Sequence, residues 1–284
     1  MHLAKYKTPA GTVRLGSIQD DRILPLLDTD PSVHSLYQIL EADDPAALVA
    51  TLIGSEQSSL SIQEVTLLPP IDHQEVWAAG VTYKRSKSAR MEESEAAASC
   101  YDRVYDADRP EIFLKATPHR VVGPGQPIHV RSDSQWNVPE PELTLVLDSR
   151  LRVVGLTVGN DVSSRDIEGE NPLYLPQAKV YNASCALGPW ITLIQSVPDP
   201  QALQISLQVA RDGTTVYQGT TNTTQMARSL GDLVDWLGRE NSFPNGAFLM
   251  TGTGIVPDSS FTLKTDDVVD IKIEGIGVLS NPVK

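Results

Sequence analysis

Residues 136–166 read WNVPEPELTLVLDSRLRVVGLTVGNDVSSRD, two largely apolar runs separated by the polar turn Asp148-Ser149-Arg150. Two apolar runs joined by a short turn are typical of a β-hairpin. In an extended chain, residues two apart point to the same side, so Glu140 and Glu142 share one face and the leucines of the strand take the other. Pro141 keeps Glu140 extended and lacks an amide hydrogen, which places this stretch at the start or edge of the strand.

The second run of the hairpin returns the chain toward the two glutamates and ends at Asp161. Neighbouring carboxylates, if partly buried, repel each other unless one is protonated or a cation lies between them. A third carboxylate at Asp161 completes a set of hard oxygen ligands suited to magnesium, manganese or calcium. Two alternatives stay open: a solvated glutamate pair on an exposed strand face, and an Asn-Asp helix cap in which Ser163 and Asp166 form a capping box.

Composition limits the partners of the chain. Its 284 residues are 40% hydrophobic, enough for a sizeable core, and carry a formal charge of −13 with a pI near 4.8. This charge repels phosphate backbones and anionic lipid, so we expect no nucleic acid and no membrane as a partner. No apolar run approaches the ~20 residues of a membrane span. Cys100 and Cys185 do not form a disulfide framework, and a cytoplasmic location is the simplest expectation.

The first seventy residues are expected to form a minor unit. Strands are predicted at TVRLGSI (12–18) and SIQEVTLLPP (61–70), and short helices at 31–40 and 44–54. Pro69-Pro70 then marks a candidate boundary. We therefore predict a small N-terminal domain at 1–70 and a larger domain at 71–284.

The larger unit is predicted to be rich in strands. Suitable runs occur at 76–83, 126–130, 141–148, 150–159, 190–194, 203–213, 214–219, 248–254 and 268–279. One amphipathic helix is predicted within 223–240, because its apolar residues recur at steps of three and four: Met226, Leu230, Leu233, Val234 and Leu237. Residues 86–107 have a helical composition but a weak apolar stripe, so they form either a solvated helix or a segment that covers a site.

Several motifs together resemble the fumarylacetoacetate hydrolase superfamily over about residues 75–284. They are the ExE pair, GLTVGNDVSSRD (155–166), a lysine ahead of NASCALGPW (182–190) and TGTG (251–254), in this order. The resemblance implies an α+β, β-rich fold, a mixed β-sheet roll with a small N-terminal α/β domain. It also implies Mg²⁺ held by Glu140, Glu142 and Asp161, with Mn²⁺ or Ca²⁺ possible, and a homodimer or higher homo-oligomer.

Further segments resemble the branch of this family that dehydrates 2-keto-3-deoxy sugar acids: GVTYKRSKSAR (80–90), RPEIFLKA (109–116), GENPLYLPQAKVY (169–181) and TGTGIVP (251–257). The implied reaction converts a 2-keto-3-deoxypentonate, a small 2-keto acid, to 2-oxoglutarate semialdehyde. Family hydrolases commonly carry a histidine where this chain has Tyr83-Lys84-Arg85-Ser86, which counts against carbon–carbon hydrolysis. Acylpyruvate hydrolysis, oxaloacetate decarboxylation and a non-catalytic module with a structural ion remain the alternatives.

Two lysines in these motifs are candidates for catalysis. A 2-keto acid chelates a divalent ion, its C3 protons become acidic, and loss of the C4 hydroxyl completes an elimination. Lys179 is the first candidate for an acid/base role, because burial beside a metal disfavours its charged form; a salt bridge to a ligand carboxylate is the alternative. Lys115 is the second, with a surface lysine as its alternative.

Five further residues are assigned to substrate binding from their motif positions. Gly252 and Thr253 lie in a glycine-rich loop whose backbone a ligand can approach closely, although a plain turn between strands would have the same sequence. Arg85 could reach distal hydroxyls or be solvated. The complete expected set is Arg85, Ser164, Arg165, Gly252 and Thr253.

Overall fold

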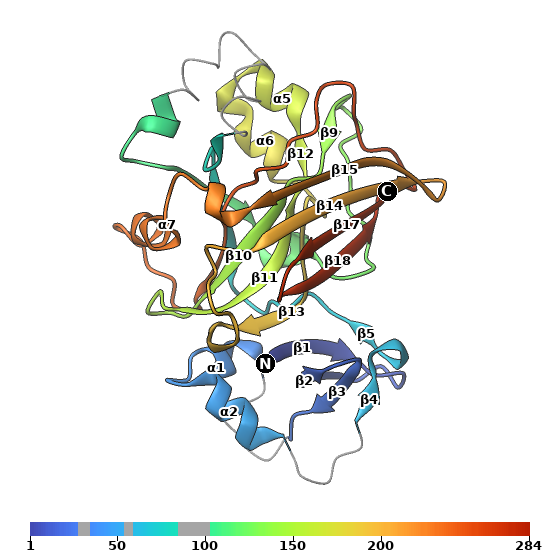
Figure 1. The fold of residues 1–284 in the computed structure, drawn as a ribbon, viewed down its shortest axis with the longest axis vertical. Helices are drawn as coiled ribbons and strands as arrows, with labels where there is room; N and C mark the ends of the chain where they lie inside the picture. Colours follow the sequence, from blue (N-terminus) through green and yellow to red (C-terminus); the bar gives the residue numbers. More distant parts are fainter. Residues whose placement is uncertain (28–34, 54–58, 85–102) are drawn as a thin grey trace.

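The structure is a computed structural model that describes residues 1–27, 35–53, 59–84 and 103–284. Its architecture is a large mixed sheet against which a smaller antiparallel sheet packs (Figure 1). Arg85, Cys100 and most of the predicted 86–107 helix lie outside the described residues. The strand-rich α+β class expected from the sequence is confirmed.

The large sheet has 12 strands, and its main path runs β4-β3-β2-β1-β13-β11-β10-β16-β6-β7, with β5 paired to β1 and β8 to β13. Its members are β1 (His2–Lys7), β2 (Val13–Gln19), β3 (Arg22–Pro25), β4 (Leu60–Ser61), β5 (Thr66–Leu67), β6 (Glu75–Gly80), β7 (Glu111–Ala116), β8 (Val121–Val122), β10 (Pro141–Leu147), β11 (Val153–Asp161), β13 (Cys185–Leu193) and β16 (Ala247–Met250).

The second sheet has four strands in the order β15-β14-β17-β18, and β9 and β12 form a two-stranded pair. These strands are β14 (Gln204–Arg211), β15 (Thr214–Asn222), β17 (Val268–Ile273), β18 (Gly277–Pro282), β9 (Asn137–Val138) and β12 (Ser163–Ser164). The described helices of five or more residues are α1 (Leu36–Leu40), α2 (Pro45–Leu52), α5 (Arg165–Glu170), α6 (Leu175–Lys179) and α7 (Leu230–Leu237).

The β10–β11 hairpin lies in the interior of the large sheet, and its two strands pair antiparallel, which confirms the predicted hairpin. Pro141 pairs with Asn160 and Glu142 with Gly159. The leucines of β10 face the four-stranded sheet and α7, where they meet side chains such as Ile271. Val146, on the opposite face of β10, packs into a second core. Both faces of the strand are thus covered, and every residue of β10 is buried. Burial and pairing together fix where the ends of the two strands meet.

The N-terminal unit joins the same sheet. β1 pairs with β13, with Leu3 opposite Ile191, and the end of α1 contacts the turn of the β10–β11 hairpin. There the Glu41 carboxylate accepts hydrogen bonds from the Ser149 amide at 2.7 Å and hydroxyl at 2.6 Å. The large sheet contains strands from both sides of residue 70. The domain boundary at this position stays a prediction.

Several predicted elements differ from the structure. The strand predicted at 126–130 is reduced to an isolated bridge of Ile128 with Val283, and the run at 268–279 is divided by a turn into β17 and β18. The amphipathic helix begins only at Leu230, because the Ser229 hydroxyl caps it by accepting from the Asp232 amide at 3.1 Å. Met226 lies before the helix and forms a β-bridge with Tyr83. Residues 61–70 hold a short 3₁₀ turn closed by a capping box on Ser61, so the predicted strand there shrinks to β5. No helix in the described part of the chain is long and apolar enough to span a membrane.

Candidate active site

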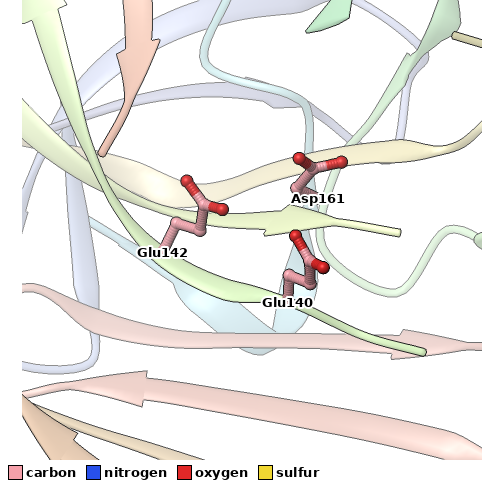
Figure 2. Close-up of side chains that lie close together, drawn as sticks. All are labelled: Glu140, Glu142 and Asp161. Atoms are coloured by element: carbon pink, nitrogen blue, oxygen red, sulfur yellow. The ribbon is translucent and has the colours of Figure 1, made fainter. Parts of the chain in front are cut away.

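Three carboxylates meet at the open end of the β10–β11 hairpin (Figure 2). Glu140 and Glu142 come from the start of β10 and Asp161 from the end of β11, and one oxygen of each lies within 4.8 Å of the others. The relative exposures of these three residues are 3%, 2% and 1%. The predicted cluster therefore forms, and it is buried rather than solvated.

Backbone contacts explain why Glu140 and Asp161 lie together. The Asp161 amide donates to the Glu140 carbonyl at 3.0 Å. The Glu140 amide donates to the Asn160 side-chain oxygen at 3.2 Å. Pro141 has no amide hydrogen to donate to β11. The contact with the Asn160 side chain therefore holds Glu140, the residue before the proline, in place.

Three buried cations surround the carboxylates. Lys179 Nζ donates to Glu140 Oε2 at 2.7 Å and Asp161 Oδ2 at 3.1 Å. Lys115 Nζ lies 2.5 Å from Asp161 Oδ1, and Arg165 Nη2 lies 2.6 Å from Glu140 Oε1. The predicted salt bridge of Lys179 is therefore present. All four contacts are made to Glu140 or Asp161.

Burial, followed by the charges of Asp161 and Glu140, raises the pKa of Glu142 well above its usual range. The Gly252 amide opposes this effect by donating to Glu142 Oε2 at 2.6 Å. Ionised Glu142 thus needs more positive charge than the surrounding side chains supply.

This donor set fits a divalent cation. Carboxylate oxygens without histidine or thiolate ligands suit Mg²⁺, Mn²⁺ or Ca²⁺, and an added double charge would relieve the repulsion at Glu142. Glu140, Glu142 and Asp161 would hold the ion. Lys115, Lys179 and Arg165 would then orient its ligands through the remaining oxygens.

The triad opens into a cavity with both apolar and charged walls. It is lined by Ala79, Gly80, Val81, Glu111, Phe113, Glu140, Glu142, Asp161, Glu168, Lys179, Gly252 and Thr253. Lys179, Gly252 and Thr253 therefore occupy positions where they can contact a ligand, as the sequence predicts. Their roles in binding or catalysis stay predictions.

Three other predicted site residues, Lys115, Ser164 and Arg165, are not among the described residues that line this cavity. Lys115 also donates to the carbonyls of Val162 at 3.0 Å and Lys179 at 2.6 Å, so its contacts are with the protein. Ser164 donates to Asn137 Oδ1 at 2.8 Å. This geometry favours positioning roles for Lys115, Ser164 and Arg165 over direct substrate contact.

The capping box of Ser163 and Asp166, one of the alternatives left open by the sequence, does not form. The Ser163 hydroxyl accepts from Lys179 Nζ at 2.5 Å and donates to the Asp161 carbonyl at 2.9 Å, so it belongs to the charged network. Asp166 accepts from the Ser134 hydroxyl and the Gln135 amide, each at 2.6 Å. The helix begins one residue later, with Ser164 at its N-cap.

Sequence reasoning missed Glu111, Phe113 and Glu168 as cavity residues. Glu111, Phe113 and Lys115 lie two residues apart along β7, so their side chains point to the same face of the strand. An inward-facing Lys115 therefore also predicts that Glu111 and Phe113 face the site. The Phe113 ring centroid lies 5.8 Å from Lys179 Nζ. Glu168 follows Arg165 by one helical turn, but α5 is too short for its periodicity to reveal this.

Gly252 is expected to tolerate no side chain. Its φ is +88°, and an added Cβ would lie 2.0 Å from Thr82 Oγ1 and 2.9 Å from the Ala79 carbonyl. We expect Gly252→Ala to lower the free energy of unfolding by about 1–3 kcal/mol or more and to weaken Mg²⁺ binding, because the amide that holds Glu142 must move.

Gly213→Ala is the matched control for this prediction, since Gly213 has a φ of +74° but no atom within 4 Å of an added Cβ. Thermal melts and Mg²⁺ calorimetry on both variants separate backbone strain from the loss of the loop. Equal Mg²⁺ affinity in the two variants would show that Gly252 does not support the triad.

A strand-rich roll with a buried carboxylate triad defines a class of metal-dependent enzymes. The chain belongs to the fumarylacetoacetate hydrolase family, because residues 75–284 match the family described as Fumarylacetoacetate (FAA) hydrolase C-terminal. The resemblance expected from the sequence motifs is thereby confirmed.

Relatives within the family extend this assignment. The chain is 56% identical over 214 residues to "Probable 2-keto-3-deoxyxylonate dehydratase" of Haloferax volcanii, covering 75% of this chain and 73% of the relative. It is 42% identical over 273 residues to "2-dehydro-3-deoxy-D-arabinonate dehydratase" of Saccharolobus solfataricus, covering 94% and 91%. A solved structure of "2-keto-3-deoxy-D-arabinonate dehydratase complexed with magnesium and 2,5-dioxopentanoate" matches with a TM-score of 0.84 at 37% identity, covering 100% and 99%.

Proposed function

We propose that the chain is a Mg²⁺-dependent dehydratase of 2-keto-3-deoxy sugar acids, for example a 2-keto-3-deoxypentonate. The observation that carries this proposal is the buried triad of Glu140, Glu142 and Asp161, which shares one cavity with Lys179. Relatives that are 42% and 56% identical have names describing dehydratases of this substrate class.

The proposed reaction removes one molecule of water. A proton leaves C3, its electron pair forms the C3=C4 bond, and the C4–O bond breaks with protonation of the departing hydroxyl. The unsaturated product then tautomerises twice. A proton is lost from C5 and one is gained at C3, which gives the C4=C5 enol; this enol loses its hydroxyl proton and gains one at C4, which gives 2,5-dioxopentanoate (2-oxoglutarate semialdehyde). When bound, the divalent ion would chelate the 2-keto acid and increase the acidity of C3.

Stabilisation of negative charge and removal of the C3 proton are assigned to residues of this chain. Lys179 donates hydrogen bonds to Glu140, Asp161 and Ser163, as a positively charged ammonium group does. Its charge is suited to stabilise negative charge that develops on the substrate. A base must instead accept a proton. Glu111 is a half-buried carboxylate on the cavity wall, and we assign it to the C3 proton.

A substrate panel tests this function against its alternatives. The purified protein with Mg²⁺ is offered 2-keto-3-deoxypentonates, acylpyruvate and oxaloacetate, and the products are identified by NMR. We expect an aldehyde from the sugar acid and little turnover of the other two. Turnover of acylpyruvate or oxaloacetate alone would overturn the dehydratase assignment and favour carbon–carbon cleavage at the same triad.

Assembly and location are further proposals. We infer a homodimer or higher homo-oligomer from the family resemblance, which light scattering on the purified protein tests. We infer a cytoplasmic location, which is compatible with Cys185 being a buried free thiol.

A further inference from the structure

The segments that follow β6 and β16 lie beside each other near the triad. The two strands are parallel neighbours in the large sheet, with Ala78 opposite Met250, and parallel neighbours end at the same edge of a sheet. Val81 after β6 and Gly252 after β16 both line the cavity of the triad. Thr82, the next residue after Val81, is fully buried with a relative exposure of 0%.

A single peptide unit connects the Thr82 side chain to the carboxylate of Glu142. The Thr82 hydroxyl donates a buried hydrogen bond to the Thr251 carbonyl at 2.6 Å. This carbonyl belongs to the peptide bond between Thr251 and Gly252, whose N–H donates to Glu142 Oε2 at 2.6 Å. Because a peptide unit is planar, a contact that holds its C=O also fixes the direction of its N–H.

The other contacts of this peptide do not fix its orientation. Thr251 is attached to the Leu143 carbonyl through its amide at 3.0 Å and its hydroxyl at 2.8 Å. These two bonds hold Thr251, but they leave the peptide that follows it free to rotate. Gly252, on the other side, has a φ of +88° and no Cβ, so it restricts this rotation less than any other residue would. The Thr82 hydroxyl therefore supplies the missing restraint.

Thr82 is itself held firmly, in a turn that is unfavourable for its sequence. Its carbonyl accepts from the Ala227 amide at 2.8 Å. Val81, just before it, has a φ of +53°, a value that β-branched residues rarely adopt. Residues persist in such conformations only where the surrounding structure imposes them, and they cluster at functional sites. The turn thus aims the Thr82 hydroxyl at the peptide that holds Glu142.

We propose that Thr82 is a positioning residue for the metal ligand Glu142 and acts through the Thr251–Gly252 peptide. This inference rests on the proposed Mg²⁺ site of the dehydratase. The hydroxyl fixes the direction of the Gly252 N–H, and by polarising the peptide it makes this N–H a stronger donor. Glu142 is then held in one orientation, ready to bind the ion.

The test removes the hydroxyl and then restores it. Thr82→Val has nearly the same shape but no donor, and its Mg²⁺ affinity, measured by calorimetry, should fall by about 10–100-fold, as is usual for groups that orient a metal ligand. Thr82→Ser keeps the hydroxyl and should bind Mg²⁺ nearly as the wild type does. Thr82 is not among the described residues that line the cavity, so turnover of Thr82→Val should recover at saturating Mg²⁺.

Thr157→Val is the matched control. Thr157 is also 0% exposed, and its hydroxyl donates to the carbonyls of Gly188 at 3.1 Å and Trp190 at 2.8 Å, between β11 and β13. Both valine variants lose a buried hydroxyl and should melt at a lower temperature without metal. Only Thr82→Val should also lose Mg²⁺ affinity.

A spectroscopic measurement on the metal-free protein tests the same contact without binding. The amide proton of Gly252, followed by NMR, should shift upfield in Thr82→Val, because the peptide is less polarised and its N–H bond to Glu142 is weaker. The shift should return in Thr82→Ser. If Thr82→Val does not fold, Thr82→Ala serves in its place, with the same expectations.

Wild-type Mg²⁺ affinity in Thr82→Val would overturn the proposal. An equal loss of affinity in Thr82→Ser would do so too, since the hydroxyl would then not be the cause. The same loss in Thr157→Val would show that Mg²⁺ binding only follows general stability. Because calorimetry needs no substrate, a wild-type protein that binds Mg²⁺ but does not dehydrate the sugar acid would refute the proposed function alone.

Discussion

Glu142→Gln is expected to abolish Mg²⁺-dependent turnover. Glu142 is 2% exposed and contributes one of the three converging carboxylates, and a neutral amide is a poorer ligand for a hard cation. We expect Mg²⁺ affinity to fall by more than about 100-fold, since even residues that only support a ligand contribute about 10–100-fold. Calorimetry and an activity assay at saturating Mg²⁺ measure the two effects.

Without bound metal, Glu142→Gln should stabilise the folded protein, although it weakens Mg²⁺ binding. Because burial and the neighbouring carboxylates raise the pKa of Glu142 above its ordinary value of 4.5, the folded state binds this proton more tightly than the unfolded chain. The free energy of unfolding should therefore fall as pH rises from 4.5 through the raised pKa. Glutamine cannot ionise, so this part of the pH dependence should disappear.

Glu274→Gln is the matched control, because Glu274 is an exposed glutamate in the turn between β17 and β18. It should preserve Mg²⁺ affinity, turnover and the pH dependence of unfolding. Wild-type Mg²⁺ affinity in Glu142→Gln would show that the ion does not bind at the triad.

Lys179→Met should lose turnover while retaining metal binding. The substitution removes one positive charge from beside Glu140 and Asp161, which lie 2.7 and 3.1 Å from Lys179 Nζ. Breaking buried pairs of this kind destabilises a protein by about 3–5 kcal/mol, so the metal-free variant should melt at a lower temperature. The carboxylates, now less neutralised, should bind Mg²⁺ at least as tightly as before.

The turnover of Lys179→Met should fall by about 10²–10³-fold, the usual effect of losing a group that stabilises developing charge. Lys264→Met, at an exposed lysine before β17, is the control. Full activity in Lys179→Met would leave Lys179 with a structural role only, whereas loss of Mg²⁺ binding would mean that it organises the triad.

The hairpin and its triad were predictable from the sequence. Alternation fixes which side chains of β10 share a face, and the short turn at 148–150 requires the second strand to return to the first. The two facts together bring Asp161 to Glu140 and Glu142. Local patterns were sufficient because the site forms within about twenty consecutive residues.

Contacts between distant segments were not predictable in this way. Lys115 is 46 residues from Asp161 in the chain, so the 2.5 Å ion pair between them depends on how β7 is placed relative to β11. Likewise β1 pairs with β13, and the paired residues His2 and Thr192 are 190 positions apart in the chain. Alternation indicates which face of a strand is buried, but not which strand will be its neighbour.

The most direct test of the account is a metal titration of activity. Protein stripped with a chelator is mixed with a 2-keto-3-deoxypentonate, and release of the aldehyde is followed as Mg²⁺ is added. We expect no turnover without the ion and saturable recovery with it in the wild type, and no recovery in Glu142→Gln. Aldehyde formation that proceeds equally in the stripped protein, or recovers fully in Glu142→Gln, would contradict a carboxylate-bound ion as the centre of this enzyme.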